Sequence, residues 1–287
     1  MQQYNPKDWF GLIFKFHKSD TFRKLFWVML SLAAYSVIVI YLELEVFKVE
    51  FTSTVMHSLL GFIISLLLVF RTNTAYDRWW EGRKQWGALV NVCRNILLKT
   101  YASKASESSK SRLKTFVIAY PNILKEHLRN TSHEQKIELL PEVVGNRHLT
   151  HVPNNIAFQM QLEIEKMKAE TPLSESAHLA LLNDCSTFTD ICGACERIRK
   201  TPIPYTYNIF IKKFIFVYIV TMPLGFAGQF HYWTILITVF TFYTLASLEL
   251  IAEEIEDPFG LDSDDLPTNE LAATIKKSAN EISKMLD

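Results

Sequence analysis

Four long apolar runs alternate with polar stretches along the chain. They cover residues 25–42, 51–70, 208–227 and 232–250. Each is close to the ~20 residues that a helix needs to cross the hydrocarbon core of a bilayer. The pattern therefore predicts an all-α membrane protein with four transmembrane helices per subunit.

The second apolar run passes directly into a polar sequence. The stretch Ser58–Trp80 reads SLLGFIISLLLVFRTNTAYDRWW. The change from apolar to polar residues comes after Phe70, and neither Pro nor Gly occurs between Phe62 and Trp80. Because nothing breaks the helix there, we expect a single helix to leave the membrane and to continue in water to about Thr100.

One stripe of this helix has two interpretations. Phe62, Leu66 and Phe70 follow at intervals of four residues, so they share one helix face. Most such stripes pack against neighbouring helices. The alternative is a pore: four spans are too few to enclose a water-filled path, so several copies would surround an axis and form stacked apolar rings that gate by dewetting. Gly61 and Ser65 lie on the neighbouring face, where small residues allow helices to approach closely.

The polar middle of the chain predicts a helical domain outside the membrane. Residues 101–112 are small and polar, as in a loop, and helical patterns cover residues 113–130, 155–170 and 173–200. We predict five segments: an amphipathic N-terminal segment, two spans, a cytosolic helical domain, two further spans and an acidic C-terminal segment. Their ranges are 1–22, 23–70, 71–204, 205–252 and 253–287.

Charges beside the first span predict its orientation. Arg23 and Lys24 precede the span, whereas the connection after it carries Glu43, Glu45 and Glu50 against Lys48 alone. Positive charge marks the cytoplasmic side. We therefore expect a multi-pass protein of the inner (plasma) membrane with both termini in the cytosol.

Composition and motifs disfavour two classes of function. The chain has 30 basic and 30 acidic residues, so its net charge is zero, and it has no basic stripe interleaved with aromatic residues. A nucleic-acid partner is therefore not expected. No nucleophile with a neighbouring base and no Walker, GxSxG or HExxH pattern is present, which argues against an enzyme.

Two short motifs resemble fragments of metal sites. Cys192 and Cys195 have CxxC spacing, but no second pair completes a zinc set, so buried small side chains are the favoured interpretation. His148 and His151 lie three apart in a predicted loop and are interpreted as structural. Lys212 and Lys213, near the start of the third span, are expected to extend to the interface rather than to line a pore.

An acidic run follows the fourth span, between Glu249 and Asp265. Carboxylates spaced through a turn can converge on a hard cation such as Ca²⁺, which takes six to eight oxygen ligands. The spacing is not that of an EF-hand loop. The alternative is a solvated acidic face or a set of ion-pair partners for Arg71, Arg78 and Arg83.

Three segments together resemble the bestrophin family, and its bacterial homologues in particular. They are FRTNTAYDRWWEGRKQWGALV, RIRKTPIPYTY and ELIAEEIEDPFGLDSDDLP, which begin at Phe70, Arg197 and Glu249. The resemblance covers nearly the whole chain. It implies a homopentameric ion channel with a central pore whose narrow neck is lined by the second helix, at positions that match Phe62, Leu66 and Phe70.

The resemblance also implies two further sites. A second, cytosolic constriction falls near Ser176, with Leu173, His178 and Leu179 as neighbouring alternatives. A calcium clasp of the animal members falls on Glu254, Asp257, Asp262 and Asp265, with backbone oxygens near Gln2–Tyr4. Glu254 and Asp257 replace amides of that pattern and Leu261 replaces an acid, so the ligand set is altered.

The expected function is passive conduction of small monovalent ions through a hydrophobic neck. The ions are chloride or other anions or, as in some bacterial relatives, cations such as sodium; neutral aromatic rings do not set the sign. No cofactor is required, and Ca²⁺ is the one candidate. The expected partners are membrane lipid and four further copies of the chain. A secondary transporter is the alternative, for which only Pro223 and the two lysines are hints. A non-conducting scaffold or receptor would explain the soluble domain but not the apolar rings.

Overall fold

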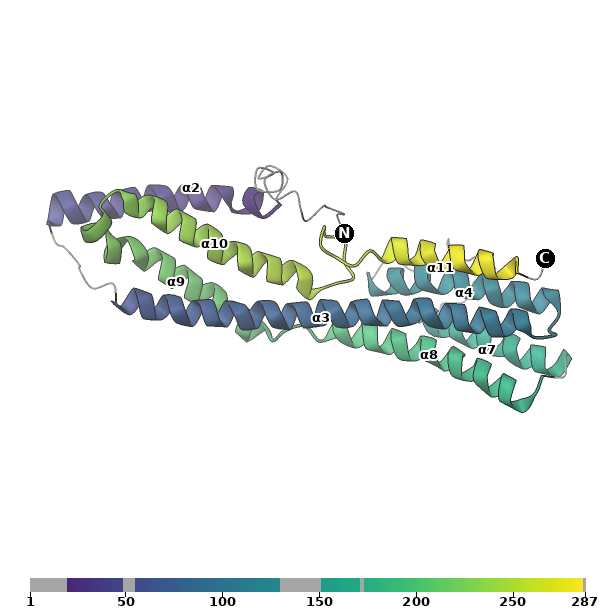
Figure 1. Cartoon of the computed structure of the whole chain (residues 1–287). Helices are drawn as coiled ribbons and strands as arrows, with labels where there is room; N and C mark the ends of the chain where they lie inside the picture. The colour runs from purple at the N-terminus through teal and green to yellow at the C-terminus, as the bar shows by residue number, and fades with distance from the viewer. Residues whose placement is uncertain (1–19, 49–54, 130–150, 171–172, 286–287) are drawn as a thin grey trace. The chain divides into compact units, whose positions relative to one another are not determined.

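The computed structural model describes residues 20–48, 55–129, 151–170 and 173–285, and no strand occurs among them. Their regular elements are helices: α2 Asp20–Tyr41, the π-helical η2 Leu42–Phe47, α3 Val55–Ala102, α4 Glu107–Leu128, α7 Val152–Glu170, α8 Glu175–Lys200, α9 Tyr205–Phe230, α10 Trp233–Glu256 and α11 Thr268–Ser283 (Figure 1). The predicted all-α fold is confirmed. The predicted N-terminal amphipathic segment lies almost entirely outside the described residues.

The chain forms two compact units. One spans Gln2–Arg78 and Pro202–Glu256; the other is built mainly from Trp79–Thr201 and Asp257–Asp287. We call them the span unit and the helical unit. Helix α3 contributes its first part to the span unit and its second part to the helical unit, as expected for a helix without a break after Phe70.

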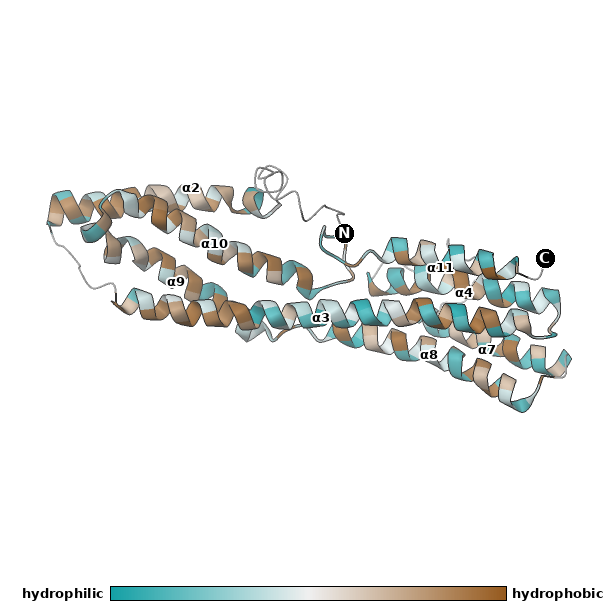
Figure 2. Ribbon diagram, viewed as in Figure 1, coloured by the Kyte–Doolittle hydropathy of each residue, from teal (hydrophilic) through white to brown (hydrophobic). Residues whose placement is uncertain are grey.

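The span unit contains the apolar stretches. Among the described residues, four helical segments are long and apolar enough to cross a membrane: Thr21–Phe47, Val55–Ala102, Tyr205–Phe230 and Trp233–Glu256. Hydrophobic residues dominate α2, α9 and α10 along most of their length (Figure 2). Helix α10 packs against α2 and α9, and α3 joins them through a shared core that includes Ile64 and Leu68. These segments match the four predicted spans.

The helical unit is a bundle around a separate core. Helix α4 packs against α7, α8 and α11, and α7 packs against α8. Fully buried side chains from these helices and from α3, such as Trp86, Tyr120 and Phe188, fill the space between them. The Tyr120 hydroxyl donates to the Phe188 carbonyl at 2.8 Å, so this buried polar group is satisfied.

Two helix starts and one whole helix illustrate where the structure differs from the predictions. Helix α4 begins at Glu107 inside the predicted loop, because the Ser106 hydroxyl caps it by accepting from the Ser109 amide. Helix α7 begins at Val152, since Pro153 stands in its first turn, where its missing N–H costs nothing. Helix α11 was not predicted at all; it buries the small or branched residues Ala272, Ile275, Ala279 and Ile282 along one face.

Candidate functional site

The predicted neck residues form an outward-facing stripe on α3. Phe62, Leu66 and Phe70 are 68%, 46% and 56% exposed, whereas Ile64 and Leu68 on the opposite side are 1% and 2% exposed. The buried side already provides the packing surface within the subunit. Packing inside its own subunit therefore does not explain the stripe.

A close contact between two helices accompanies this arrangement. A Cβ atom added to Gly61 on α3 would lie 2.9 Å from the Tyr218 hydroxyl oxygen on α9. The absence of a side chain at this residue lets α9 approach the buried side of α3, as the sequence predicted. Ser65, by contrast, is exposed, and its hydroxyl donates to the Gly61 carbonyl of the same helix at 2.8 Å.

A buried ion pair holds α3 one residue after the stripe. The Arg71 side chain is fully buried, and its Nη2 donates to Oε2 of Glu256 at 2.7 Å. Glu249 lies further off, with Oε2 3.6 Å from Arg71 Nε. The other Glu256 oxygen accepts the Ile203 backbone N–H at 2.7 Å. Glu256 thus ties α3, α10 and the start of the Ile-Pro segment together.

Some residues of the acidic run after the fourth span therefore form ion pairs within the subunit. Its members Glu249 and Glu256 are partners of Arg71, as one of the two interpretations predicted. Glu253 pairs with Lys212 at 2.9 Å, and both side chains are about half exposed. Lys212 is therefore used within its own subunit, in agreement with an interfacial position.

The predicted clasp residues have different environments. Glu254 on α10 pairs with Lys24 at 2.8 Å. Asp257 and Asp262 are exposed, whereas Asp265 is 4% exposed. The Asp262 N–H donates to Oδ2 of Asp265 at 2.7 Å, and the buried Oδ1 has no hydrogen-bond partner. Burial raises the pKa of Asp265 to about 6, and the neighbouring Asp262 and Asp257 carboxylates act in the same direction.

These residues fit a calcium ion only in part. A cation beside Asp265 Oδ1 would satisfy an oxygen that has no partner, and a cleft of about 180 Å³ adjoins it. Arg129 also lines that cleft, so a guanidinium group already supplies positive charge there. Within the described part of the helical unit, Asp257, Asp262 and Asp265 do not converge as a ligand group. Calcium prefers six to eight oxygens, and this loop offers fewer.

Comparison with known proteins decides the family. The family model described as bacterial/fungal bestrophin protein matches residues 1–281. The chain belongs to the bestrophin family. A voltage-dependent anion channel-forming protein of Synechocystis is 35% identical over 77% of this chain and 74% of its own length. One from Nostoc is 29% identical over 97% of this chain and 93% of its own length.

Solved structures of bestrophins have the same fold. The crystal structure of a bacterial bestrophin homologue from Klebsiella pneumoniae, with a point mutation, superposes with a TM-score of 0.83 at 27% identity. The match covers 91% of this chain and 100% of the other. Membership of this family points to a channel and away from an enzyme.

The candidate cytosolic constriction lies at the start of α8. Ser176 is exposed in the first turn, where the Ser174 hydroxyl caps the helix by accepting from the Ala177 amide. Of the three alternatives, only Leu179 is also exposed. His178 is buried and pairs with Glu165 at 3.1 Å, and Leu173 packs against the core. Ser176 and Leu179 are therefore the two of these four that are free to face a pore.

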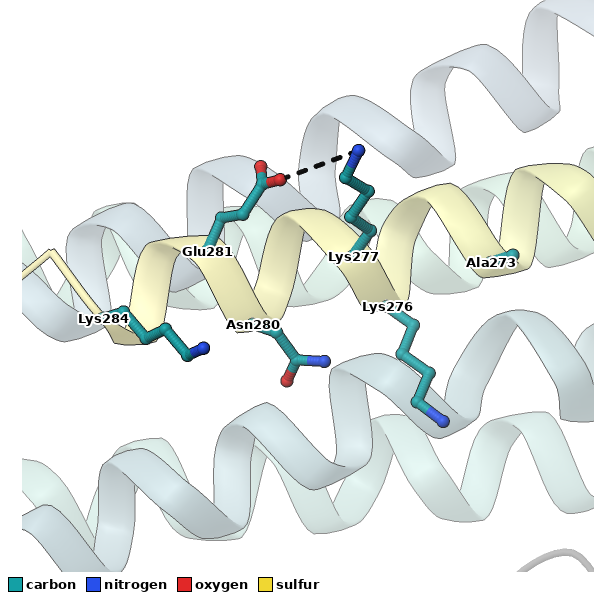
Figure 3. A pocket seen from close by; sticks show the side chains of 6 residues that line it. All are labelled: Ala273, Lys276, Lys277, Asn280, Glu281 and Lys284. Carbon is teal, nitrogen blue, oxygen red and sulfur yellow. Dashed lines mark ion pairs between the residues drawn. The ribbon is translucent and has the colours of Figure 1, made fainter.

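A shallow hollow on α11 does not form a binding site in this bestrophin. Its lining residues all come from one face of that helix: Ala273, Lys276, Lys277, Asn280, Glu281 and Lys284 (Figure 3). Lys277 and Glu281 form a long ion pair at 4.0 Å, with both side chains mostly exposed. We interpret this surface as the solvated face of an amphipathic helix.

Proposed function

We propose that this bestrophin is a homopentameric channel that conducts small monovalent anions through a neck formed by α3. The observation that carries the proposal is the outward-facing stripe of Phe62, Leu66 and Phe70 on a helix whose opposite side is buried. Five copies of the stripe around an axis would form three stacked apolar rings. Such a constriction closes when water leaves it.

The assignment to anions is supported by the relatives. The Synechocystis and Nostoc proteins are named as voltage-dependent anion channel-forming proteins. Cation conduction, for example of sodium, is the competing possibility. Asn73 and Asp77 continue the exposed side of α3 beyond Phe70, and five copies of Asp77 would favour cations at the inner end of the neck.

Exposed apolar residues of the helical unit support the proposed assembly into a pentamer. Phe158 and Leu162 on α7 and Leu179 on α8 are exposed and line one groove of about 590 Å³ together with polar residues such as Glu165. An apolar patch with charged neighbours is typical of a protein interface rather than of a lipid contact. A neighbouring subunit is the occupant that a pentamer would supply.

The remaining predictions belong to the same proposal. The basic flank of the first span supports cytosolic termini in the inner (plasma) membrane. Ser176 is the proposed cytosolic constriction, with Leu179 as the apolar alternative one turn later. Calcium binding is proposed for the loop that carries Asp262 and Asp265. Glu254 and Asp257 belong to the proposed clasp as well, although Glu254 already has a lysine partner.

Reversal potentials test the function most directly. Purified protein in planar bilayers between unequal salt concentrations should give discrete unitary currents whose reversal potential has the sign expected for an anion conductor. The opposite sign would assign the channel to cations. Slow, saturable and coupled uptake without unitary currents would instead support the secondary transporter and overturn the channel proposal.

A further inference from the structure

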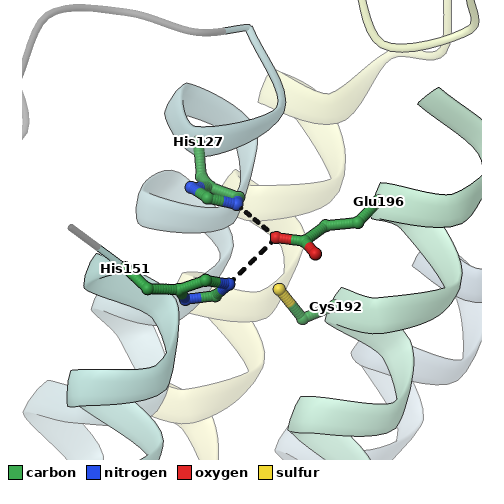
Figure 4. A group of neighbouring side chains, drawn as sticks. All are labelled: His127, His151, Cys192 and Glu196. Atoms are coloured by element: carbon green, nitrogen blue, oxygen red, sulfur yellow. Dashed lines mark hydrogen bonds and ion pairs between the residues drawn. The ribbon is translucent and has the colours of Figure 1, made fainter. Parts of the chain in front are cut away.

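Four side chains with metal-binding atoms converge in the helical unit. His127 lies in the last turn of α4, and His151 directly precedes α7. Cys192 and Glu196 are one turn apart on α8 and point to the same side, toward the two imidazoles (Figure 4). One ligand atom from each residue lies within 4.8 Å of those of the other three.

We propose that these residues bind a divalent transition-metal ion of the zinc class. The four ligands would be His127, His151, Cys192 and Glu196. The site is separate from the neck and from the acidic loop after α10, and it does not depend on the channel proposal. Its role would be to join α4, α7 and α8.

The donor types select the metal. Two imidazoles, a thiol and a carboxylate offer nitrogen, sulfur and oxygen, which suits Zn²⁺ and similar borderline-soft ions. Calcium and magnesium prefer oxygen ligands alone. A set of four ligands is also the number that a tetrahedral structural zinc site requires.

Hydrogen bonds already orient the ligands. Oε1 of Glu196 accepts from Nε2 of His127 at 2.5 Å and from Nε2 of His151 at 2.9 Å, and Lys200 donates to the other oxygen at 3.3 Å. The carboxylate is thus directed at the two imidazoles.

Only small shifts would convert this cluster into a metal site. Ligand bonds of about 2.0–2.3 Å in a tetrahedron place neighbouring ligand atoms about 3.3–3.7 Å apart. The two His–Glu contacts would lengthen by less than about 1 Å, and the widest separation would shorten by about 1 Å. Side-chain rotations on helix surfaces can supply both changes.

Binding has a defined proton balance. The metal replaces the Cys192 thiol proton, which passes to solvent, and a metal–sulfur bond forms. It also takes the place of the Nε2 protons that now bond to Glu196. His127 and His151 must then each carry their ring proton on Nδ1, so these two protons are moved within the rings and not released. At His151 this breaks a 3.2 Å bond from the Asn154 backbone N–H. Asn154 is exposed in the first turn of α7, so water can replace that bond.

A second His–Glu pair in the same unit provides a comparison. His178 bonds to Glu165 at 3.1 Å, and this pair is not part of a converging ligand group in the described chain. Cys185 on the same helix is buried and donates to the Ala157 carbonyl at 3.5 Å, outside the cluster. His178 and Cys185 therefore serve as matched controls for His151 and Cys192.

Cobalt binding to the full-length protein in detergent tests the site. Co²⁺ added to metal-free protein should give a sulfur-to-cobalt charge-transfer band at one ion per chain, and Zn²⁺ should abolish it. The band should be lost in Cys192→Ser and kept in Cys185→Ser. His151→Asn should weaken Co²⁺ binding at least tenfold, whereas His178→Asn should leave it unchanged. No band in the wild type, or a band that survives Cys192→Ser, would overturn the proposal.

A measurement on the wild-type protein tests the site without requiring any variant to fold. X-ray absorption of the protein loaded with one Zn²⁺ per chain should show one sulfur at about 2.3 Å and nitrogen or oxygen ligands at about 2.0–2.1 Å. A shell without sulfur would mean that the cluster is only a hydrogen-bonded group and that the zinc is bound elsewhere.

Discussion

Apolar side chains lie exposed in both units, but their surroundings differ. In the span unit, Trp27, Phe216 and Phe240 are exposed on helices whose apolar stretches hold few charges. In the helical unit, Phe158 and Leu179 are exposed beside polar and charged residues in one groove. The first arrangement suits lipid and the second suits a protein partner. Exposure alone therefore does not identify the neighbour; the residues around the patch do.

The stripe on α3 is a third case. It belongs to an apolar helix of the span unit, yet the exposed residues Asn73 and Asp77 follow it on the same side. The proposed pore would place both the apolar and the polar part of this exposed side along one water-filled path.

The largest expected effect is on stability, at the buried pair that anchors this stripe. Replacing Glu256 with Gln leaves the Arg71 charge buried without its closest partner, so the free energy of unfolding should fall by about 3–5 kcal/mol. Chemical unfolding of the protein in detergent measures this loss in the free energy of unfolding. Glu253→Gln, which breaks the half-exposed pair with Lys212, should cost less than about 1 kcal/mol. Equal losses in both variants would contradict the distinction between the two pairs.

The next effect is on assembly, through the groove of the helical unit. Phe158→Glu together with Leu162→Glu places charges where a neighbouring subunit is proposed to pack, so the oligomer should dissociate. Light scattering of the detergent-solubilised protein reports the subunit number. Phe216→Glu on the lipid-type surface is the control for assembly. If the groove variant keeps the wild-type mass, the groove does not face a partner.

A smaller effect concerns the neck. Replacing Phe62, Leu66 and Phe70 together by Ala should widen and wet the constriction, so open probability should rise several-fold in planar bilayers. Phe216→Ala combined with Phe240→Ala removes comparable exposed aromatic surface from α9 and α10 and should leave gating unchanged. Unchanged currents in the neck variant would indicate that the stripe packs against neighbouring helices.

The smallest expected effect is calcium binding at the acidic loop. Calorimetry should show weak binding, with a dissociation constant of about 10⁻⁴–10⁻³ M, because few oxygens are available. Asp262→Ala plus Asp265→Ala should abolish the heat, and Asp264→Ala should serve as the exposed acidic control. Equal heats in wild type and double variant would show that these two carboxylates do not bind the ion.

Much of the fold follows from local patterns. The spans are visible because about twenty consecutive apolar residues have few other uses. The long helix α3 is predictable because it contains no Pro and because no Gly lies between Phe62 and Glu81, where the sequence changes from apolar to polar. Helix α11 was missed because two of its five buried positions are Ala and one is Thr, which gives a weak apolar signal. The start of α4 was missed because the serines around Ser106 look like a loop, although one of them caps the helix.

The metal cluster shows where sequence patterns stop. In the sequence, Cys192 is three residues from Cys195 and His151 is three residues from His148, and neither pair has a complete ligand set. Cys195 is not part of the cluster, and His148 lies outside the described residues. The other two ligands are His127 and Glu196, from different helices. Packing of α4 and α7 against α8, not spacing along the chain, brings the four together.

The sequence alone establishes the family, the four spans and the presence of an apolar stripe at Phe62, Leu66 and Phe70. Periodicity can define such a face because helix geometry is set by the local backbone. It cannot say what the face contacts, because that depends on where the other helices lie. The tertiary structure answers this within the subunit: α9 occupies the side of Gly61, Ile64 and Leu68, and the stripe is left outside.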